Sequence, residues 1–330
     1  MNSIKGLKSK LVKKFLQIKL LASRSSPTYT HSLFDLLIFN KIRQLLGGRI
    51  RIIATASAPI APEVLQLLRV FFCCPIIEAY GQSECGGAAT SVKLSDHSLG
   101  HIGGPVSTCG IKLVDIPEMN YFTSNLKGED KGEEFAPCGE ICIKGPIVMP
   151  KYFKNPKLTS EVIDQEGWLH SGDVGKLLKN GAIQIIDRKK NIFKLSQGEY
   201  VAPEKLENIY IQSQYVALVF VYGDSFQDYT VGIIVPERGT VEDLAKKIMG
   251  AVADWNEICQ DERVKKVVLE DIRRIGAEGK LNGIEQVKKI YLHPEMLTPD
   301  TGLLTPTFKI KRFDMKNYFS GVISDLYSKK

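Results

Sequence analysis

Long apolar runs are absent from this chain of 330 residues. The longest strand-like run covers residues 215–222, which is far shorter than the roughly 18 residues that a membrane-spanning helix needs. The basic start of the chain is followed by neither an apolar core nor a small-residue cleavage site, so no secretory signal is expected. With 44% hydrophobic and 25% charged residues, the sequence predicts globular domains rather than a membrane span or bulk disorder.

Cysteines are few, and their spacing suggests no pairing. There are seven, an odd number, and Cys73 and Cys74 are adjacent. This pattern argues against a disulfide framework and for a reducing compartment. Cys138 and Cys142 stand four residues apart, but no histidine or cysteine pair completes a zinc-binding pattern. The sequence by itself therefore predicts no metal–thiolate site.

An excess of positive charge is also absent from most of the chain. The formal net charge of +7 comes entirely from residues 1–24, which hold six lysines, one arginine and no acidic residue. The remainder carries equal numbers of basic and acidic residues. A nucleic-acid-binding surface is therefore not expected.

The basic segment has the spacing of an amphipathic helix. Over residues 4–22, apolar residues recur every three or four positions and lysines occupy the others. Such a helix either lies on an anionic membrane surface or packs its apolar stripe on protein, and we favour packing on protein. Residues 33–46 predict a second helix that ends at Gly47 and Gly48.

Short strands and helices then alternate. Strands are predicted at 50–55 and 76–79 with a helix at 62–72 between them, and this order is typical of two parallel strands joined by a crossover helix. From residue 100 to 187, glycine and proline separate short β-rich segments. This pattern of short segments predicts an antiparallel sheet or a small barrel. A polar loop at 124–134 is expected to interrupt it.

After the basic stretch near residue 190, the order of predicted helices and strands is typical of a compact α+β domain. We therefore predict a first domain at 1–187, of α/β class with a small β-barrel, and a second α+β domain at 188–330. The elements predicted for the second domain are a helix at 203–212, strands at 215–222 and 230–235, and helices over 240–274.

Tyr80-Gly-Gln-Ser-Glu84 follows the predicted strand at 76–79. Gly81 permits a tight turn with close backbone approach, and Tyr80 offers a flat ring. Ser83 adds a hydroxyl, and Glu84 adds a hard oxygen ligand. Together these groups suit a nucleotide with Mg²⁺ at the carboxyl end of a parallel strand. A solvated loop without a ligand is the alternative.

Two further clusters carry candidate chemistry. Gly167-Trp-Leu-His-Ser-Gly-Asp173 ends in an aspartate that could accept hydrogen bonds from a ribose diol, or could cap a hairpin turn. Asp187-Arg-Lys-Lys-Asn-Ile-Phe-Lys194 places four cations beside the predicted domain boundary. An exposed, solvated run of charge has the same composition.

Other short motifs accompany these three clusters along the chain. They are Gly47-Gly-Arg-Ile-Arg51, Thr55-Ala-Ser-Ala-Pro59, Gly139-Glu-Ile-Cys-Ile-Lys-Gly-Pro146, the string from Ile186 to Glu207, and Leu304-Thr-Pro-Thr-Phe-Lys309. In this order they resemble the adenylate-forming ligase superfamily, and within it the long-chain fatty acid–CoA ligases (acyl-CoA synthetases). The resemblance begins near residue 33. It implies the C-terminal half of such an enzyme: the remainder of a large adenylation domain, followed by a small mobile domain.

The resemblance also implies a reaction in two steps, with a long-chain fatty acid, ATP and coenzyme A as substrates and Mg²⁺ as cofactor. The fatty acid carboxylate attacks the α-phosphate of ATP, which releases pyrophosphate and leaves an acyl-adenylate. The thiol of coenzyme A then attacks this mixed anhydride and displaces AMP.

Roles for residues of the first domain follow from the resemblance. Glu84 would help to hold Mg²⁺, and Ser83 would offer its hydroxyl to the phosphate or acyl oxygen. Tyr80, beside the turn at Gly81, would stack on the adenine of ATP or AMP. Asp173 would bind the ribose hydroxyls. The edge of the adenine would face the backbone of Ala56, Ser57 and Ala58.

In the second domain, the resemblance implies that Arg188 adds donors to the same ribose. Lys309 would place a positive charge at the bridging oxygen, where negative charge grows in the first transition state. Lys190 matches the hinge about which the small domain rotates between the two half-reactions. The other orientation would present Lys194 and Gly198, where glycine lets the pantetheine arm pass close to the backbone.

The sequence departs from the family at several points. Relatives carry upstream a Ser/Thr/Gly-rich loop ending in Pro-Lys-Gly that holds the β- and γ-phosphates, and no such loop occurs here. Most of the large domain, with much of the acyl tunnel, is therefore expected to lie outside this sequence. Ala56 and Ala79 replace glycines, which would narrow the adenine pocket, and Ser83 replaces a threonine.

Three hypotheses follow from the sequence. The chain is part of a fatty acid–CoA ligase, or an AMP-binding module without catalysis of its own, or a membrane-associated, non-enzymatic fragment that uses residues 1–24. The family implies a place on the cytoplasmic face of a membrane such as the endoplasmic reticulum, or in the cytoplasm.

Overall fold

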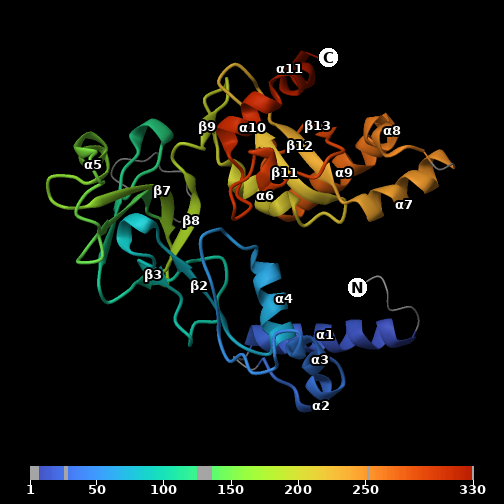
Figure 1. Cartoon of the computed structure of the whole chain (residues 1–330), viewed down its shortest axis with the longest axis horizontal. Helices are drawn as coiled ribbons and strands as arrows, with labels where there is room; N and C mark the ends of the chain where they lie inside the picture. The colour runs from blue at the N-terminus through green and yellow to red at the C-terminus, as the bar shows by residue number, and fades with distance from the viewer. Residues whose placement is uncertain (1–6, 26–28, 125–135, 251–252, 329–330) are drawn as a thin grey trace. The chain divides into compact units, whose positions relative to one another are not determined.

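The computed structural model describes residues 7–25, 29–124, 136–250 and 253–328. The chain, drawn in Figure 1, divides into two compact units, residues 1–185 and 186–330. Each unit has apolar clusters of its own. Within the described ranges, no helix is both long enough and apolar enough to cross a membrane.

Helices at the start of the first unit pack around a small apolar core of Phe34, Phe39, Val70 and Cys73. Phe15 of the first helix stacks on Phe34 with ring centroids 4.1 Å apart, so this helix buries part of its apolar stripe on protein. The elements are α1 (Leu7–Ser25), α2 (Ser32–Phe34), the π-helix η1 (Asp35–Phe39), α3 (Asn40–Gln44) and α4 (Pro62–Phe72).

One lysine of α1 is buried rather than solvated. Lys19 is 3% exposed, and its Nζ lies 2.6 Å from Oδ1 of Asp35 and 3.2 Å from Sγ of Cys73. A buried ammonium needs such a partner, because removing an unpaired charge from water is costly. The ion pair therefore ties α1 to η1. Ile18 and Leu21 remain exposed, so α1 packs with only part of its apolar surface.

A four-stranded sheet contains the predicted parallel unit. β1 (Ile53–Thr55) and β2 (Ile76–Tyr80) pair in parallel, and α4 crosses between them in sequence. β3 (Thr90–Ser91) and β4 (Gly104–Pro105) extend the sheet in the order β1-β2-β3-β4 by antiparallel pairing. The prediction of two parallel strands with a crossover helix is confirmed.

The second sheet of this unit is open. β5, β6 and β7 pair antiparallel in the order β5-β6-β7-β8, and the described residues close no barrel, so the antiparallel sheet is the observed one of the two predicted forms. Ile141, Ile143, Leu169 and Ile183 are buried in its core. The strands and short helices are β5 (Gly110–Val114), β6 (Cys138–Lys144), β7 (Leu169–Leu177), β8 (Ile183–Arg188), η2 (Ser83–Cys85), η3 (Pro117–Met119) and α5 (Pro156–Val162).

β7 contains a bulge. Glu140 of β6 pairs with Val174, and Cys142 pairs with His170. Residues 171–173 of β7 therefore lie opposite the single residue Ile141 of β6. Gly172, within the bulge, has a φ of 73°, a left-handed conformation that glycine adopts without strain. The glycine-rich cluster is therefore a bulged strand and not the hairpin turn that the sequence also allowed.

A three-stranded sheet forms the centre of the second unit, where β11 pairs antiparallel with β12 and β12 pairs in parallel with β13. Val219 and Val221 belong to one apolar cluster and Phe220 to another, as the alternation of side chains along a strand requires. The elements are β9 (Phe193–Lys194), β10 (Tyr200–Val201), α6 (Pro203–Tyr210), β11 (Val216–Tyr222), β12 (Val231–Pro236), α7 (Arg238–Met249), α8 (Trp255–Gln260), α9 (Glu262–Glu278), β13 (Lys289–Leu292), η4 (Pro299–Thr301), α10 (Arg312–Tyr318) and α11 (Ser320–Ser328).

Most predicted elements exist with shifted ends. The helix α4 has its predicted bounds, whereas β1 begins at Ile53, three residues later than predicted. The elements β13, α10 and α11 have no counterpart among the predictions. The predicted loop at 124–134, apart from Ser124, lies outside the described residues.

Candidate functional site

Two loops leave the same edge of the first sheet. Because β1 and β2 are parallel, with Thr55 opposite Glu78, their carboxyl ends lie together. Residues 56–58 follow β1 with exposed side chains, and residues 81–84 follow β2. Ser57 has a φ of 77°, and such strained backbone clusters at ligand-binding sites. Open α/β sheets bind ligands at this kind of edge.

Tyr80, the last residue of β2, contacts Asp173 in the bulge of β7. The tyrosine hydroxyl donates a hydrogen bond of 2.7 Å to Oδ2 of Asp173, which is 7% exposed. The backbone N–H of Asp173 donates to Oγ of Ser171 at 3.1 Å. Burial, reinforced by the charge of Asp173, raises the pKa of Tyr80 well above its usual value, so the hydroxyl keeps its proton and remains a donor. Hydroxyl groups of a ribose could take the place of this donor.

Glu84 lies in η2, directly after the turn that follows Tyr80. The hydroxyl of Tyr152 donates to Oε1 of Glu84 at 2.6 Å, and the carbonyl oxygen of Glu84 accepts from the N–H of Met149 at 2.7 Å. The hydrogen bond to Glu84 is the main cause that raises the pKa of Tyr152 to about 12. The tyrosine thus orients a carboxylate whose second oxygen is a hard ligand.

Gly81 is required by a close backbone approach. A Cβ atom at this position would lie 1.6 Å from the carbonyl oxygen of Gly87, so no larger residue fits unless that loop moves. Ser83 begins η2 and has an exposed side chain. The turn therefore holds the serine hydroxyl and the Glu84 carboxylate at the sheet edge, in adjacent positions.

The remaining predicted site residues belong to the second unit. Arg188 ends β8, and Lys190 is exposed in the turn that follows. Lys194 ends β9, and its Nζ lies 5.3 Å from the ring centroid of Tyr200. Gly198, between β9 and β10, has a φ of 94° and is exposed. These positions form one short segment at the start of the unit.

Lys309 is held by its backbone in a tight loop. Its carbonyl oxygen accepts from the N–H of Thr305 at 2.8 Å, and its own N–H donates to Oγ1 of Thr305 at 3.0 Å. Leu304 and Ile310 bridge across this loop. Phe308, beside the lysine, has a φ of 61° and is 66% exposed. The loop thus fixes the backbone of Lys309 and leaves its side chain half-buried.

Asp187 anchors the start of the second unit. The side chain is fully buried; its Oδ1 accepts from the N–H of Arg188 at 2.6 Å and from Nδ2 of Asn191 at 3.3 Å. Its Oδ2 accepts from the N–H of Glu204, at the start of α6, at 2.8 Å. Burial, helped by the charge of Glu204, raises the pKa of Asp187 to about 6. The turn that contains Lys190 is thereby tied to α6.

Sequence reasoning missed two contributors to these sites. Tyr152 was not singled out, because no spacing rule connects it with Glu84, 68 positions earlier in the chain. In the sequence, Asp187 is only the first residue of a basic run. The one available signal is its place between the β-rich segments that end near residue 187 and the basic stretch that follows.

Known proteins resemble this chain in both sequence and fold. The AMP-binding enzyme family matches residues 11–153. Human long-chain-fatty-acid–CoA ligase 1 is 47% identical over 305 residues, which cover 92% of this chain and 42% of that protein. Rat long-chain-fatty-acid–CoA ligase 5 is 46% identical over 297 residues, which cover 90% of this chain and 42% of that protein.

Residues 11–153 of this chain belong to the AMP-binding enzyme family. The chain spans about two fifths of the length of these curated relatives. The predicted resemblance to the long-chain fatty acid–CoA ligases is confirmed.

Solved structures with a similar fold confirm the predicted fold class. The adenylation domain of a carboxylate reductase from Mycobacterium chelonae matches 97% of this chain and 45% of its own, with a TM-score of 0.73 and 27% identity. The corresponding domain from Segniliparus rugosus, in complex with AMP and a co-purified carboxylic acid, matches 96% of this chain and 46% of its own. Its TM-score is 0.72, with 28% identity.

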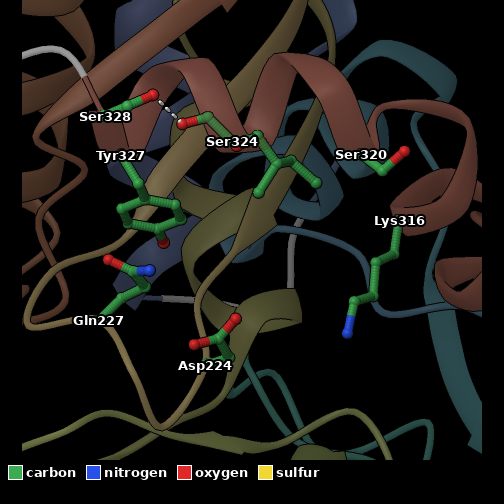
Figure 2. A pocket seen from close by; sticks show the side chains of 8 residues that line it. Asp224, Gln227, Lys316, Ser320, Ser324, Tyr327 and Ser328 are labelled. Carbon is green, nitrogen blue, oxygen red and sulfur yellow. Dashed lines mark hydrogen bonds between the residues drawn. The ribbon is translucent and has the colours of Figure 1, made fainter.

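A pocket of about 460 Å³ lies in the second unit of the chain (Figure 2). The helix α11 forms one side of it, and the loop that carries Asp224 and Gln227 lies opposite. Of the described residues that line it, none is a predicted site residue. The lining residues are Asp224, Gln227, Lys316, Ser320, Ile323, Ser324, Tyr327 and Ser328.

Proposed function

We propose that this chain forms part of a ligase that activates a long-chain fatty acid with ATP and transfers the acyl group to coenzyme A. The observation that carries the proposal is the contact of Tyr80 with Asp173 beside the carboxyl edge of the parallel strands. It occurs in a chain that is 46–47% identical to such ligases over about nine tenths of its length. An adenylation domain of the same fold that contains AMP gives further support.

The nucleotide would lie against this edge. The ring of Tyr80 would face the adenine, with the backbone of residues 56–58 along the edge of the base. Asp173 would accept hydrogen bonds from the ribose hydroxyls, and Arg188 would add donors to the same ribose. The low exposure of Asp173 supports this role, because hydrogen bonds to a charged group are stronger where water is scarce.

The residues around Glu84 fit a magnesium ion. Carboxylate oxygens are the ligands that Mg²⁺ prefers, and the hydrogen bond from Tyr152 would hold the carboxylate in one orientation. When bound, the cation would supply charge neutralisation of the phosphates. Ser83, exposed beside it, would donate a hydrogen bond to a phosphate or acyl oxygen.

We also propose that residues 188–330 form the small mobile domain of such a ligase, and the division of the chain at 185–186 supports this. Lys309 would place its ammonium at the bridging oxygen during adenylate formation. Lys190 would serve as the hinge. Lys194 and Gly198 would lie on the face that meets coenzyme A during the second step.

Binding of AMP to the full chain tests the nucleotide site by calorimetry. Asp173→Asn keeps the size of the side chain and removes its charge. We expect AMP to bind about 10-fold to 100-fold more weakly, because a hydrogen bond to a charged group contributes about 1.5–3 kcal/mol. Asp300→Asn, an exposed residue of η4, is the matched control and should bind AMP as the unchanged chain does. Equal affinity of Asp173→Asn and the unchanged chain would contradict the assignment.

The two half-reactions test the role of Lys309. Lys309→Ala should abolish ATP–pyrophosphate exchange and spare the transfer of preformed acyl-adenylate to coenzyme A, because only the first step develops charge at the bridging oxygen. Lys311→Ala removes an exposed lysine two positions away and should affect neither step. If both half-reactions survive Lys309→Ala equally, the role is wrong.

A second candidate function is an AMP-binding module without catalysis of its own. The contact of Tyr80 with Asp173 favours it, because this contact supports nucleotide binding without requiring a catalytic step. Formation of palmitoyl-CoA from palmitate, ATP and coenzyme A by the isolated chain would exclude this candidate. Binding of AMP without any such turnover would support it.

A further inference from the structure

Three side chains with metal-binding atoms meet on neighbouring strands of the second sheet. They are Glu140 and Cys142 of β6 and His170 of β7, and their donor atoms all lie within 4.8 Å of one another. Cys142 and His170 are directly paired across the strands. Nδ1 of His170 lies 3.2 Å from Oε2 of Glu140 and 3.4 Å from Sγ of Cys142. The cluster is separate from Glu84, the residue that we propose as the magnesium ligand.

The distances from Nδ1 of His170 to the other two donor atoms match those between the ligands of one tetrahedral metal ion. Zinc bonds of about 2.0 Å to nitrogen or oxygen and about 2.3 Å to sulfur place tetrahedral ligands roughly 3.3–3.6 Å apart. A carboxylate, an imidazole and a thiolate are all common zinc ligands, and the thiolate disfavours the hard cations Mg²⁺ and Ca²⁺. These three donor groups together therefore favour a divalent transition-metal ion such as Zn²⁺ over Mg²⁺ or Ca²⁺.

We propose that Oε2 of Glu140, Sγ of Cys142 and Nδ1 of His170 form a binding site for Zn²⁺, with water as the fourth ligand. The side chains of Glu140 and His170 are 13% and 29% exposed, so water and the metal reach the site from the surface. Cys142 is fully buried beneath them. The sequence concealed this site, because His170 stands 28 residues from Cys142 and only the pairing of β6 with β7 brings them together.

Outer contacts hold two of the three ligands in position. Nε2 of His170 lies 3.6 Å from Oδ2 of Asp164, as in the carboxylate–histidine–zinc arrangement that orients metal-binding imidazoles. Oε1 of Glu140 accepts a hydrogen bond from the N–H of Gly172 at 3.1 Å, which leaves Oε2 directed at the histidine. Such outer partners are what a positioned metal site requires.

The charges around the cluster suit a divalent cation. A metal ion binds cysteine as its thiolate, so the thiol of Cys142 gives up its proton when the metal binds. Metal binding forms the zinc–sulfur bond and releases that proton to solvent. The thiolate and the carboxylates of Glu140 and Asp164 then carry three negative charges, and the nearby ammonium of Lys112 offsets one of them. Zn²⁺ balances the other two.

Metal binding to the full chain tests the proposal. The chain is first freed of metal with a chelator and then titrated with Co²⁺, which reports its ligands by absorption. One Co²⁺ per chain should produce the intense near-ultraviolet band of a cobalt–thiolate bond, and Zn²⁺ should displace it. Saturation without a thiolate band, or no saturable binding, would overturn the site. This measurement needs no variant and so does not depend on whether a variant folds.

Variants then assign the ligands. Cys142→Ser and His170→Gln should each weaken Zn²⁺ binding by more than the roughly 10-fold to 100-fold that loss of an outer partner costs, and Asp164→Asn should fall within that range. Cys138→Ser, another buried cysteine of β6, is the matched control and should bind Zn²⁺ unchanged. Each variant is compared after its thermal unfolding shows a folded chain. Unchanged Zn²⁺ affinity in Cys142→Ser, or equal losses in Cys142→Ser and Cys138→Ser, would overturn the assignment.

Discussion

Glu78 shows what burial does to a carboxylate that has no strong partner. It lies on β2 and is 9% exposed. Desolvation raises its pKa to about 7, against a weaker lowering by the charge of Arg69. The guanidinium of Arg69 instead donates to the carbonyl oxygen of Ile76 at 3.0 and 2.8 Å.

The raised pKa of Glu78 makes stability depend on pH. The folded state holds its proton up to about pH 7, whereas the unfolded chain releases it near 4.5. The contribution of Glu78 to the free energy of unfolding is therefore fully present below 4.5 and is lost as pH rises through about 7. Glu78→Gln should remove this loss, which urea unfolding at pH 5 and pH 8 measures. The variant should gain stability relative to the unchanged chain between these two pH values.

If the free energy of unfolding changes with pH by the same amount in Glu78→Gln and in the unchanged chain, the prediction is wrong. The comparison is needed because Asp187 also has a raised pKa, about 6, and contributes to the pH dependence of each chain. The difference between the two chains isolates Glu78. Gln at this position keeps the size of the side chain and cannot ionise.

At the scale of residues, the sequence predicted the positions that carry distinctive chemistry. Tyr80, Glu84 and Asp173 were found because an aromatic ring or a carboxylate stands beside glycine in a short motif. Tyr152 was not found, since its partnership with Glu84 exists only after the chain folds. The sequence predicts which groups are reactive, but the partner of each group depends on strand pairing.

The helix α6 depends on a buried ion pair. Nη2 of Arg312, the first residue of α10, lies 2.5 Å from Oε2 of Glu207. Oε1 of Glu207 accepts from the N–H of Val221 on β11 at 2.8 Å. The two side chains are only 11–16% exposed, so neither charge has much contact with water. One carboxylate therefore joins α6, β11 and α10.

Removing one member of this pair should be strongly destabilising. Arg312→Met leaves the charge of Glu207 buried without its partner, and such a change costs about 3–5 kcal/mol. Urea unfolding measures the loss. Arg263→Met removes the exposed partner of Asp261 and should cost less than about 1 kcal/mol.

A double variant separates charge from packing. Adding Glu207→Gln to Arg312→Met removes the unpaired charge and keeps an oxygen that accepts from Val221. Much of the lost stability should return. If the double variant is as unstable as Arg312→Met alone, lost packing and not the buried charge explains the effect.

At the scale of elements, strong periodicity was predictable and irregular strands were not. The helix α4 was predicted with its observed bounds because proline begins it and apolar residues recur with helical spacing. The strand β7 was not predicted, because its bulge and Gly172 interrupt the alternation of apolar and polar residues. Lys19 occupies one of the polar positions of the helical pattern, and the sequence does not show that Asp35 holds it in the interior.

For the whole molecule, the connection between the two units is short and strongly charged. The chain divides at 185–186, and the turn after β8 contains Lys189 and Lys190. Hydrogen bonds of Asp187 fix both the end of β8 and the start of α6. Any hinge in this segment is therefore confined to a few residues of the turn.

Limited digestion with trypsin tests this view of the connection. Proteases cut exposed turns in preference to packed elements, so an early cut after Lys190 is expected. It would yield fragments of about 190 and 140 residues, which mass spectrometry identifies. The variant Lys189→Gln with Lys190→Gln should lose that cut and keep the others. Early cutting only inside the strands and helices of either unit would contradict the prediction.

Changes of chain length should be tolerated very unevenly along the second sheet. Deleting one residue from the bulge of β7 would turn the side chains on one side of the deletion to the opposite face. Asp173 lies in this bulge and His170 directly precedes it, so they could not both keep their places. The turn between β7 and β8 contains no bulge, and its residues 179–181 are exposed. Evolution can therefore lengthen or shorten that turn freely, whereas the bulge must be inherited at constant length.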